Sequence, residues 1–279
     1  MKYSLLIFLV LFGLNLFAWN QILYPENTDN LRIHILDVGQ GDSQLIELPG
    51  GVQILSDAGP GKEVLFELDK IIPPTDRYID LLFISHPQVD HFGGFTDVID
   101  SYDIGLIVYS GIEGNSDAWQ EFSDKVAQKG IPVVHLSARD KIQYKNSHID
   151  ILSPEDEPYG GLNDNSLVFL LDSEGAKALF TGDIGFDVEN RLIENDLDID
   201  ILKVAHHGSR YSSGLEFLRK VTPRISLIGV GDNNFGHPHG NTLGRLVSVG
   251  SEIYRTDING LISLDIDDGM VKIETEKIE

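Results

Sequence analysis

Short apolar runs, each closed by a loop rich in glycine or acidic residues, recur along most of this 279-residue chain. The run from Leu31 to Val38 alternates apolar and polar residues and then breaks at Gly39, which is the pattern of a half-buried strand. The runs at 81–85 and 199–205 are more continuously apolar and predict buried strands. Further strands are predicted at 43–47, 52–55, 104–109, 131–136, 149–152, 167–171, 176–181, 225–230, 253–255, 261–266 and 271–275.

Apolar residues spaced three and four apart predict the helices. In 62–72 they share one face before Pro73 ends the segment, and in 116–129 they include two aromatic residues before Gly130. Similar segments lie at 186–195, 213–221 and 241–249. The elements divide into two comparable halves without a short repeat, so we expect an α/β protein in which two mixed sheets pack face to face and helices cover the outside.

The amino-terminal segment differs from the rest. Lys2 is followed by an apolar run from Tyr3 to Ala18 that continues to Tyr24, as in a secretory signal. Small residues at a cleavage position are scarce, so residues 1–24 are predicted to be a signal peptide or a signal anchor that attaches residues 3–24 to the membrane; a buried core helix is the alternative. We expect a linker at 25–30, a folded domain at 31–279, and an extracytoplasmic location, secreted or anchored.

Composition narrows the function. The chain is 42% hydrophobic, as folded proteins are, and its formal charge of -23 disfavours a general DNA-binding module unless metal ions or a local cationic patch reverse the field. Lys203, Arg210, Arg245 and Arg255 are candidates for such a patch. There is no cysteine, so any metal must be bound by imidazole, carboxylate or amide groups.

Histidines gather at the ends of the predicted strands. Six of the nine occur in three pairs, each where an apolar run meets a loop that contains glycine, and these are His86 with His91, His206 with His207, and His237 with His239. Strands of a layered fold can bring such loops to one edge, where nitrogen and oxygen donors suit zinc or a similar divalent ion. His34, His135 and His148 lie within or beside strands and are interpreted as structural.

Acidic and amide residues accompany these histidines. Asp90 lies between the first pair, Asp183 follows the strand at 176–181, and a loop contains Asn163, Asp164 and Asn165. One or two cations in such a set would lower the pKa of a bound water and make it a nucleophile. The pattern therefore predicts a hydrolase.

The motifs resemble those of a known family. HPQVDH at 86–91 resembles the HxHxDH signature of the metallo-β-lactamase superfamily. Further motifs follow in order along the chain, namely DVGQGDS (37–43), DAG (57–59), NSLV (165–168), TGD (181–183), LKVAHHGS (202–209) and GHP (236–238). With these motifs, residues 31–276 resemble the β-lactamase-like domain of the ComEC-type competence DNA-uptake proteins.

The resemblance implies a metallo-β-lactamase-like αββα sandwich and roles for individual residues. The implied metal ligands are His86, Asp90, His91, Asp183 and His206. Asp90 would also orient the attacking water, and His237 would bind phosphate or protonate the leaving group. Groups supporting the site or lying at its rim would be Asp37, Asp42, Ser43, Asp57 and Ser209.

The chain departs from the family at the first metal position. Gln88 replaces a histidine, and Asn163 to Asn165 occupy the region of another. Gln88, Asn165 and His207 are therefore candidates for metal ligands or rim groups. We expect one or two divalent ions, zinc or manganese, with one ion between Asp90, His91, Asp183 and His206 as the minimum.

Three functions fit these observations. The first is a metal-dependent phosphodiesterase or nuclease acting on DNA, with a separate DNA-uptake channel as a candidate partner. The second is hydrolysis of a small ester, lactone or thioester by the same activated water. The third is a non-catalytic binding domain of the cell envelope with a degraded metal site. Metal content and a comparison of substrates separate the three.

Overall fold

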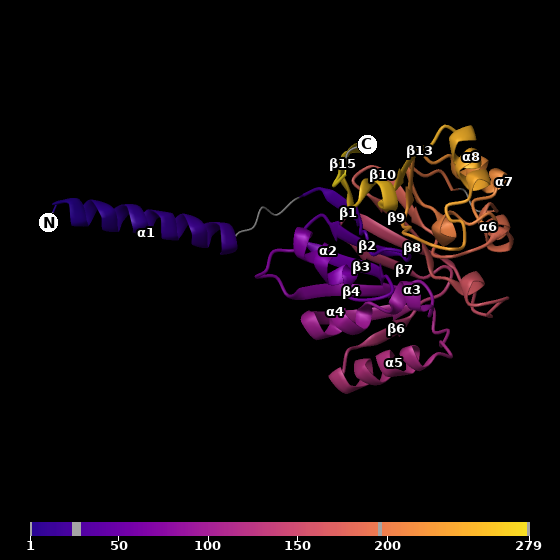
Figure 1. The fold of residues 1–279 in the computed structure, drawn as a ribbon, viewed down its shortest axis with the longest axis horizontal. Helices are drawn as coiled ribbons and strands as arrows, with labels where there is room; N and C mark the ends of the chain where they lie inside the picture. The colour runs from indigo at the N-terminus through magenta and orange to yellow at the C-terminus, as the bar shows by residue number, and fades with distance from the viewer. Residues whose placement is uncertain (1, 24–28, 195–196, 278–279) are drawn as a thin grey trace.

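A computed structural model of the chain describes residues 2–23, 29–194 and 197–277. Two β-sheets pack face to face, and helices cover their outer faces (Figure 1). The expected α/β sandwich of two mixed sheets flanked by helices is confirmed.

The larger sheet comes from the first half of the chain and its last two strands. These strands are β1 (Leu31–Ile35), β2 (Ser43–Leu48), β3 (Val52–Ala58), β4 (Tyr78–Ile84), β5 (Asp103–Tyr109), β6 (Val133–His135), β14 (Ile262–Asp267) and β15 (Met270–Thr275). They lie in the order β15-β14-β1-β2-β3-β4-β5-β6. Pairing is antiparallel from β15 to β3 and parallel from β3 to β6.

The smaller sheet is built in the same way. Its strands are β7 (Lys141–Tyr144), β8 (Ser147–Ser153), β9 (Val168–Ser173), β10 (Ala176–Phe180), β11 (Ile201–Lys203), β12 (Ile225–Ile228) and β13 (Glu252–Arg255), in the order β13-β12-β11-β10-β9-β8-β7. The β9–β10 hairpin is antiparallel, as predicted, and β10 to β13 are parallel. In such open sheets, binding sites lie beyond the carboxyl ends of the parallel strands.

Three apolar layers hold the sandwich together. Between the sheets, Phe83 of β4 packs edge to face against Phe169 of β9, with the ring centroids 5.2 Å apart. Phe169 stacks on Phe180 of β10, with the centroids 4.5 Å apart. The outer face of the larger sheet is covered by α2 (Glu63–Ile71), α4 (Phe95–Ser101) and α5 (Asp117–Lys129). The outer face of the smaller sheet is covered by α6 (Phe186–Leu192), α7 (Leu215–Val221) and α8 (Gly240–Ser248).

Several short elements of the structure were not predicted from the sequence. Helix α4 follows two glycines that resemble a chain break, although Phe95, Val98 and Ile99 form its buried face. Strand β7 is a partly exposed edge strand, and the one-turn helices α3 (Val89–Phe92) and α9 (Thr256–Asn259) have too few residues to show a period. The strand predicted at 199–205 is shortened to β11 because the chain turns at Ala205 into the 3-10 segment η2 (Ala205–Gly208).

The amino-terminal run forms helix α1 (Lys2–Leu23), which extends away from the sandwich in Figure 1. Its described side chains are exposed, for example Phe8 at 63% and Leu11 at 60%, so the core-helix alternative is wrong for this part of the helix. Within the described part of the chain, no helix meets the length and hydropathy expected of a membrane span. Residues 24–28, most of the predicted linker, lie outside the described residues.

Candidate metal centre

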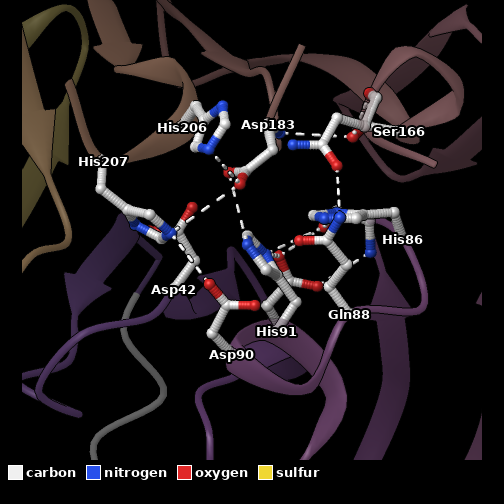
Figure 2. A network of polar contacts seen from close by, with 12 residues as sticks. Asp42, His86, Gln88, Asp90, His91, Ser166, Asp183, His206 and His207 are labelled. Atoms are coloured by element: carbon white, nitrogen blue, oxygen red, sulfur yellow. Dashed lines mark hydrogen bonds and ion pairs between the residues drawn. The ribbon is translucent and has the colours of Figure 1, made fainter. Parts of the chain in front are cut away.

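The predicted site residues meet where the parallel halves of the two sheets end. The end of β3 supplies Asp57 and the chain after β4 supplies the segment 85–91, while the chain after β10 and β11 supplies Asp183 and the segment 205–208. Figure 2 shows the side chains of His86, Asp90, His91, Asp183, His206 and His207 around one common space. The site is thus assembled from residues that are distant in sequence.

Asp57 fixes the orientation of His91. Its carboxylate accepts hydrogen bonds from the Ser85 backbone N–H at 2.8 Å, the Ser85 hydroxyl at 2.7 Å and His91 Nδ1 at 2.8 Å. Asp57 is buried and has φ +56°, a conformation that aspartate adopts more readily than most residues. His91 Nε2 is thereby left facing Asp183 Oδ1 at 3.3 Å. Asp57 supports His91, which agrees with its predicted role.

The same serine orients His86. Because the Ser85 hydroxyl donates to Asp57, its oxygen is free to accept from His86 Nδ1 at 3.0 Å. This arrangement assigns the proton of a neutral His86 to Nδ1 and the lone pair to Nε2. The His86 and His91 rings lie 4.2 Å apart.

The adjacent residues His206 and His207 point in different directions, because both have a left-handed backbone with φ of 51° and 50°. The His207 side chain is 2% exposed, and its Nδ1 donates to the carbonyl of Gly229 at 2.9 Å. Its Nε2 lies 3.5 Å from Asp90 Oδ2 and 3.8 Å from Asp183 Oδ2. The His206 side chain is 34% exposed, and its Nε2 lies 3.6 Å from Asp183 Oδ2.

Asp183 lies between these histidines. Gly182 precedes it with φ +52°, and a Cβ there would lie only 2.8 Å from the Cβ of Ser166. Glycine therefore allows the chain to turn tightly and direct the buried Asp183 carboxylate towards the rings of His91 and His207.

The donor atoms fit a divalent cation. Within the described part of the chain, several buried atoms of the cluster make no hydrogen bond, namely Nε2 of His86, His91 and His207 and both carboxylate oxygens of Asp183. Buried polar atoms without partners are costly, and a cation bound by the lone pairs of His91, His207 and Asp183 would satisfy those atoms. Two overlapping groups with ligand atoms within 4.8 Å of one another are His86, His91 and Asp183, and Asp90, His91 and His207.

The charges of the cluster also favour a cation. Burial alone would lower the pKa of the His91 imidazole, but the Asp183 and Asp57 carboxylates raise it well above its ordinary value. The pKa of His207 is likewise raised, against the effect of burial, to about 10 by Asp183 and Asp42. Burial also opposes ionisation of Asp183, yet His91 and His207 hold the pKa of that carboxyl well below its usual range. The site thus stabilises positive charge among its carboxylates.

His207 is better placed than His206 to bind an ion with Asp90, His91 and Asp183. The sequence favoured His206, with His207 as an alternative. His207 forms one close donor group with Asp90 and His91 and another with Asp42 and Asp183, and His206 is in neither of these groups.

The first metal position has fewer strong donors. His86 and Asp183 are present, but Gln88 Nε2 donates a hydrogen bond to the Asn163 side-chain oxygen. Asn165 is engaged in its own loop: its side-chain oxygen accepts from the Tyr159 N–H at 2.9 Å and its amide donates to the carbonyls of Tyr159 and Gly161 at 2.7 Å. Asn165 therefore holds the loop together, and its side-chain oxygen already accepts a hydrogen bond within that loop.

Of the predicted supporting groups, Asp42 is part of the cluster. Its carboxylate lies 3.3 Å from His207 Nδ1 and pairs with the buried ammonium of Lys203, and its pKa is lowered by Lys203 and His207 against the effect of burial. Asp37 instead forms an ion pair with Lys277. Ser43 of β2 donates to the Asp57 carbonyl of β3, and the Ser209 hydroxyl accepts from the Tyr211 N–H within its own loop.

His237 faces the cluster from the loop after β12. Its ring lies 5.4 Å from the His206 ring and 6.4 Å from the His207 ring. Asn233 holds this loop by accepting from the N–H groups of Phe235 at 3.1 Å and His237 at 3.0 Å. Burial and the neighbouring His206 and His207 lower the pKa of His237 to about 4.

Sequence reasoning missed Ser85, Gly229 and Asn233, and it named Asn163 only as part of the loop at 163–165. Ser85 lies directly before His86 and is the one with a usable signal, because a hydroxyl at a buried strand end next to a candidate ligand needs a partner. Gly229 contributes only its backbone carbonyl, and because every residue has one, the sequence gives no sign of this role.

Comparison with known proteins agrees with this fold. A family model described as the metallo-beta-lactamase superfamily matches residues 36–232, and the chain belongs to this superfamily. Its members are generally metal-dependent hydrolases, and the fold uses divalent metals.

The similar curated proteins include competence proteins, as the motifs predicted. The chain is 26% identical over 260 residues to ComE operon protein 3 of Bacillus subtilis (strain 168), covering 86% of this chain and 34% of that protein. It is 27% identical over 262 residues to Competence protein ComA of Neisseria gonorrhoeae, covering 91% and 35%. The chain therefore spans about a third of the length of these relatives.

Solved structures show the same fold. The metallo-beta-lactamase fold protein YhfI of Bacillus subtilis superposes with a TM-score of 0.57 at 14% identity, over 85% of this chain and 100% of that chain. The Zn(2+)-bound PqqB of Methylobacterium extorquens superposes with a TM-score of 0.52 at 9% identity, over 81% and 88%. At such identities the likeness shows the fold alone.

Proposed function

We propose that this chain is a metal-dependent phosphodiesterase that cleaves DNA, with one tightly bound divalent ion between Asp90, His91, Asp183 and His207. The observation that carries this proposal is the set of buried nitrogen and oxygen atoms that converge without hydrogen-bond partners. Two imidazoles and two carboxylates suit zinc or manganese. The similarity to competence proteins favours DNA as the substrate.

Each side chain then has a separate task. When bound, a divalent ion lowers the pKa of water and neutralises charge on a phosphoryl oxygen. Asp57 and Gly229 keep the lone pairs of His91 and His207 directed into the site. The Asp90 side chain, 34% exposed against 1% for Asp183, is the carboxylate placed to accept a proton from the attacking water.

His237 is the candidate for contact with the substrate. It lies beyond His206 at the partly exposed side of the cluster, where the leaving group of a phosphodiester would emerge. There its imidazole would hydrogen-bond a phosphoryl or leaving-group oxygen.

The surface favours single-stranded DNA over duplex DNA. Of the four basic residues considered from sequence, Arg210 is exposed, but Lys203 is buried against Asp42, and the Arg245 guanidinium donates to the carbonyls of Ser212 and Ser213. Arg255 pairs with Asp257. Exposed aromatic rings occur instead in the loops that follow η2 and β12, Tyr211 at 67% and Phe235 at 71%. Unpaired bases stack on such rings, and this contact does not depend on net charge.

The location follows the same proposal. We infer an extracytoplasmic domain, secreted or attached to the membrane through residues 3–24, that acts on DNA beside a separate DNA-uptake channel. The support is the apolar amino-terminal run and the competence proteins among the relatives.

Metal analysis combined with a substrate panel tests the function. Protein purified without chelator is analysed for zinc and manganese, and is then assayed with single-stranded DNA, bis(p-nitrophenyl) phosphate, a lactone and a thioester. We expect bound metal and cleavage of the first two, both lost in Asp183→Asn and both kept in Asp187→Asn, a matched change at an exposed carboxylate of α6. Preference for the lactone or thioester would assign a different substrate. Absence of metal and turnover would support a binding domain.

A further inference from the structure

Two amide side chains occupy the part of the site where the family binds its first ion. Gln88 follows β4 of the larger sheet, and Asn163 begins the 3-10 segment η1 (Asn163–Asn165) before β9 of the smaller sheet. Gln88 Nε2 donates to Asn163 Oδ1, so the two amides form a bridge between the sheets. Both side chains belong to half-buried residues.

Backbone contacts place this bridge next to the metal centre. The Gln88 N–H donates to the His86 carbonyl at 3.0 Å. The Asn163 carbonyl accepts from the Ser166 hydroxyl at 2.8 Å, and the oxygen of that hydroxyl accepts from the Asp183 N–H at 3.3 Å. In Figure 2, Gln88 lies beside His86 and Ser166 beside Asp183, on the border of the same space.

The bridge leaves one amide group ready to donate. Because Asn163 Oδ1 accepts from Gln88, the orientation of the Asn163 amide is fixed and its Nδ2 is directed away from that bond. Within the described part of the chain, Nδ2 of Asn163 donates to no protein acceptor. A group held in a fixed position with unused N–H donors can bind an anion without reorganising.

The same bridge is a poor metal site. Neutral amides are weak ligands, so the strong donors grouped at this position are His86, His91 and Asp183, and the proposed ion already uses His91 and Asp183. Zinc sites in proteins use three or four strong ligands. The side chains present therefore fit one tightly bound ion, and they do not fit a second.

We propose that the Gln88–Asn163 bridge takes the place of the ion that the family binds at this first position, as the group that binds the phosphoryl oxygen of the substrate. Asn163 Nδ2 donates a hydrogen bond to a non-bridging oxygen and strengthens that bond as negative charge develops there. Gln88 is a positioning residue that orients the Asn163 amide. This inference rests on the proposed hydrolase function, because it assigns a role within the same site.

Binding of inorganic phosphate to metal-loaded protein, measured by calorimetry, tests the bridge without requiring turnover. Asn163→Ala removes the donor, and Asn163→Asp replaces it with a negative group that repels the anion. We expect phosphate affinity to fall about 10- to 100-fold in Asn163→Ala and further in Asn163→Asp, because hydrogen bonds to charged groups are stronger than those between neutral groups. Asn190→Asp, which adds the same charge on an exposed part of α6, should leave phosphate affinity unchanged.

Activity and metal content complete the test. On bis(p-nitrophenyl) phosphate, kcat should fall about 100- to 1000-fold in Asn163→Ala, as for other oxyanion donors, with one ion per chain still bound. Gln88→Ala should have a smaller effect of the same kind. The double variant Gln88→His/Asn163→His should bind a second ion.

Two results would overturn the inference. These are two tightly bound ions in the wild-type protein, and phosphate affinity in Asn163→Asp equal to that of the wild type. A wild-type protein that binds phosphate through Asn163 but cleaves no phosphodiester would refute the proposed function and leave the anion site standing. Cleavage that is insensitive to Asn163→Asp would refute the anion site alone.

Discussion

Replacing either of the adjacent histidines with alanine should have very unequal effects on metal binding. His207 Nε2 lies 3.5 Å from Asp90 Oδ2 and 3.8 Å from Asp183 Oδ2, so in our assignment it is one of four ligands. Structural zinc sites with four ligands bind with about 10–16 kcal/mol, or roughly 3 kcal/mol per ligand. Because about 1.4 kcal/mol corresponds to a factor of ten, His207→Ala should weaken metal affinity about a hundredfold or more.

His206→Ala is the matched control, since it removes the same side chain one residue away. His206→Ala should weaken metal affinity by less than about tenfold, which is the smaller end of the loss seen when a group that hydrogen-bonds a metal ligand is removed. Competition titrations against a chromophoric chelator measure both affinities. Urea unfolding of metal-free protein separates the loss of the His207–Gly229 hydrogen bond, worth about 1 kcal/mol, from the loss of a ligand. A greater loss of affinity in His206→Ala than in His207→Ala would show that our ligand assignment is wrong.

Three further predictions concern the surroundings of the site. Lys203→Met leaves the buried Asp42 carboxylate without its counter-charge and should lower the free energy of unfolding by about 3–5 kcal/mol in urea titrations; a loss below about 1 kcal/mol would contradict this account of the pair. Burial raises the pKa of Glu189 to about 7, so folded Glu189 takes up a proton before the unfolded chain does and wild-type stability should rise as pH falls from about 7 towards about 4.5. In melting curves recorded between about pH 5 and 8, the melting temperature of Glu189→Gln should rise less than that of the wild type as pH falls. An equal dependence on pH in both proteins would show that Glu189 does not titrate in this way. Phe235→Ala removes an exposed ring and should weaken binding of oligothymidylate in fluorescence anisotropy by about 1–3 kcal/mol without changing the melting temperature; unchanged affinity would show that no base stacks there.

The sandwich was predictable because its strands are continuous apolar runs that end in recognisable loops. The β9–β10 hairpin and the helix that begins after Ser116 and ends before Gly130 have local signals, and the structure contains both. The helix α4 was missed because Gly93 and Gly94 resemble a break in the chain. In the structure they pack too closely against other backbone for any side chain, because a Cβ on Gly93 would overlap the Pro60 carbonyl oxygen and one on Gly94 the Ala58 carbonyl oxygen.

The candidate site was predictable to the level of the loop, but less so to the level of the residue. His206 and His207 are adjacent, and the left-handed turn that directs His207 inward leaves no mark in the sequence. Asn163 and Asn165 are two residues apart in one 3-10 turn, which directs one amide to Gln88 and the other to its own loop. Lys203 was interpreted as a surface cation because lysine is seldom buried, and only its pairing with Asp42 explains its position.

The ligands proposed for the ion come from loops of both sheets, with Asp90 and His91 after β4 and Asp183 and His207 after β10 and β11. An ion bound by all four would join the sheets at one end of the sandwich, and the sheets could not separate until it dissociated. Unfolding would then require release of the ion, so the lifetime of the folded protein under denaturing conditions would be limited by how fast the ion leaves.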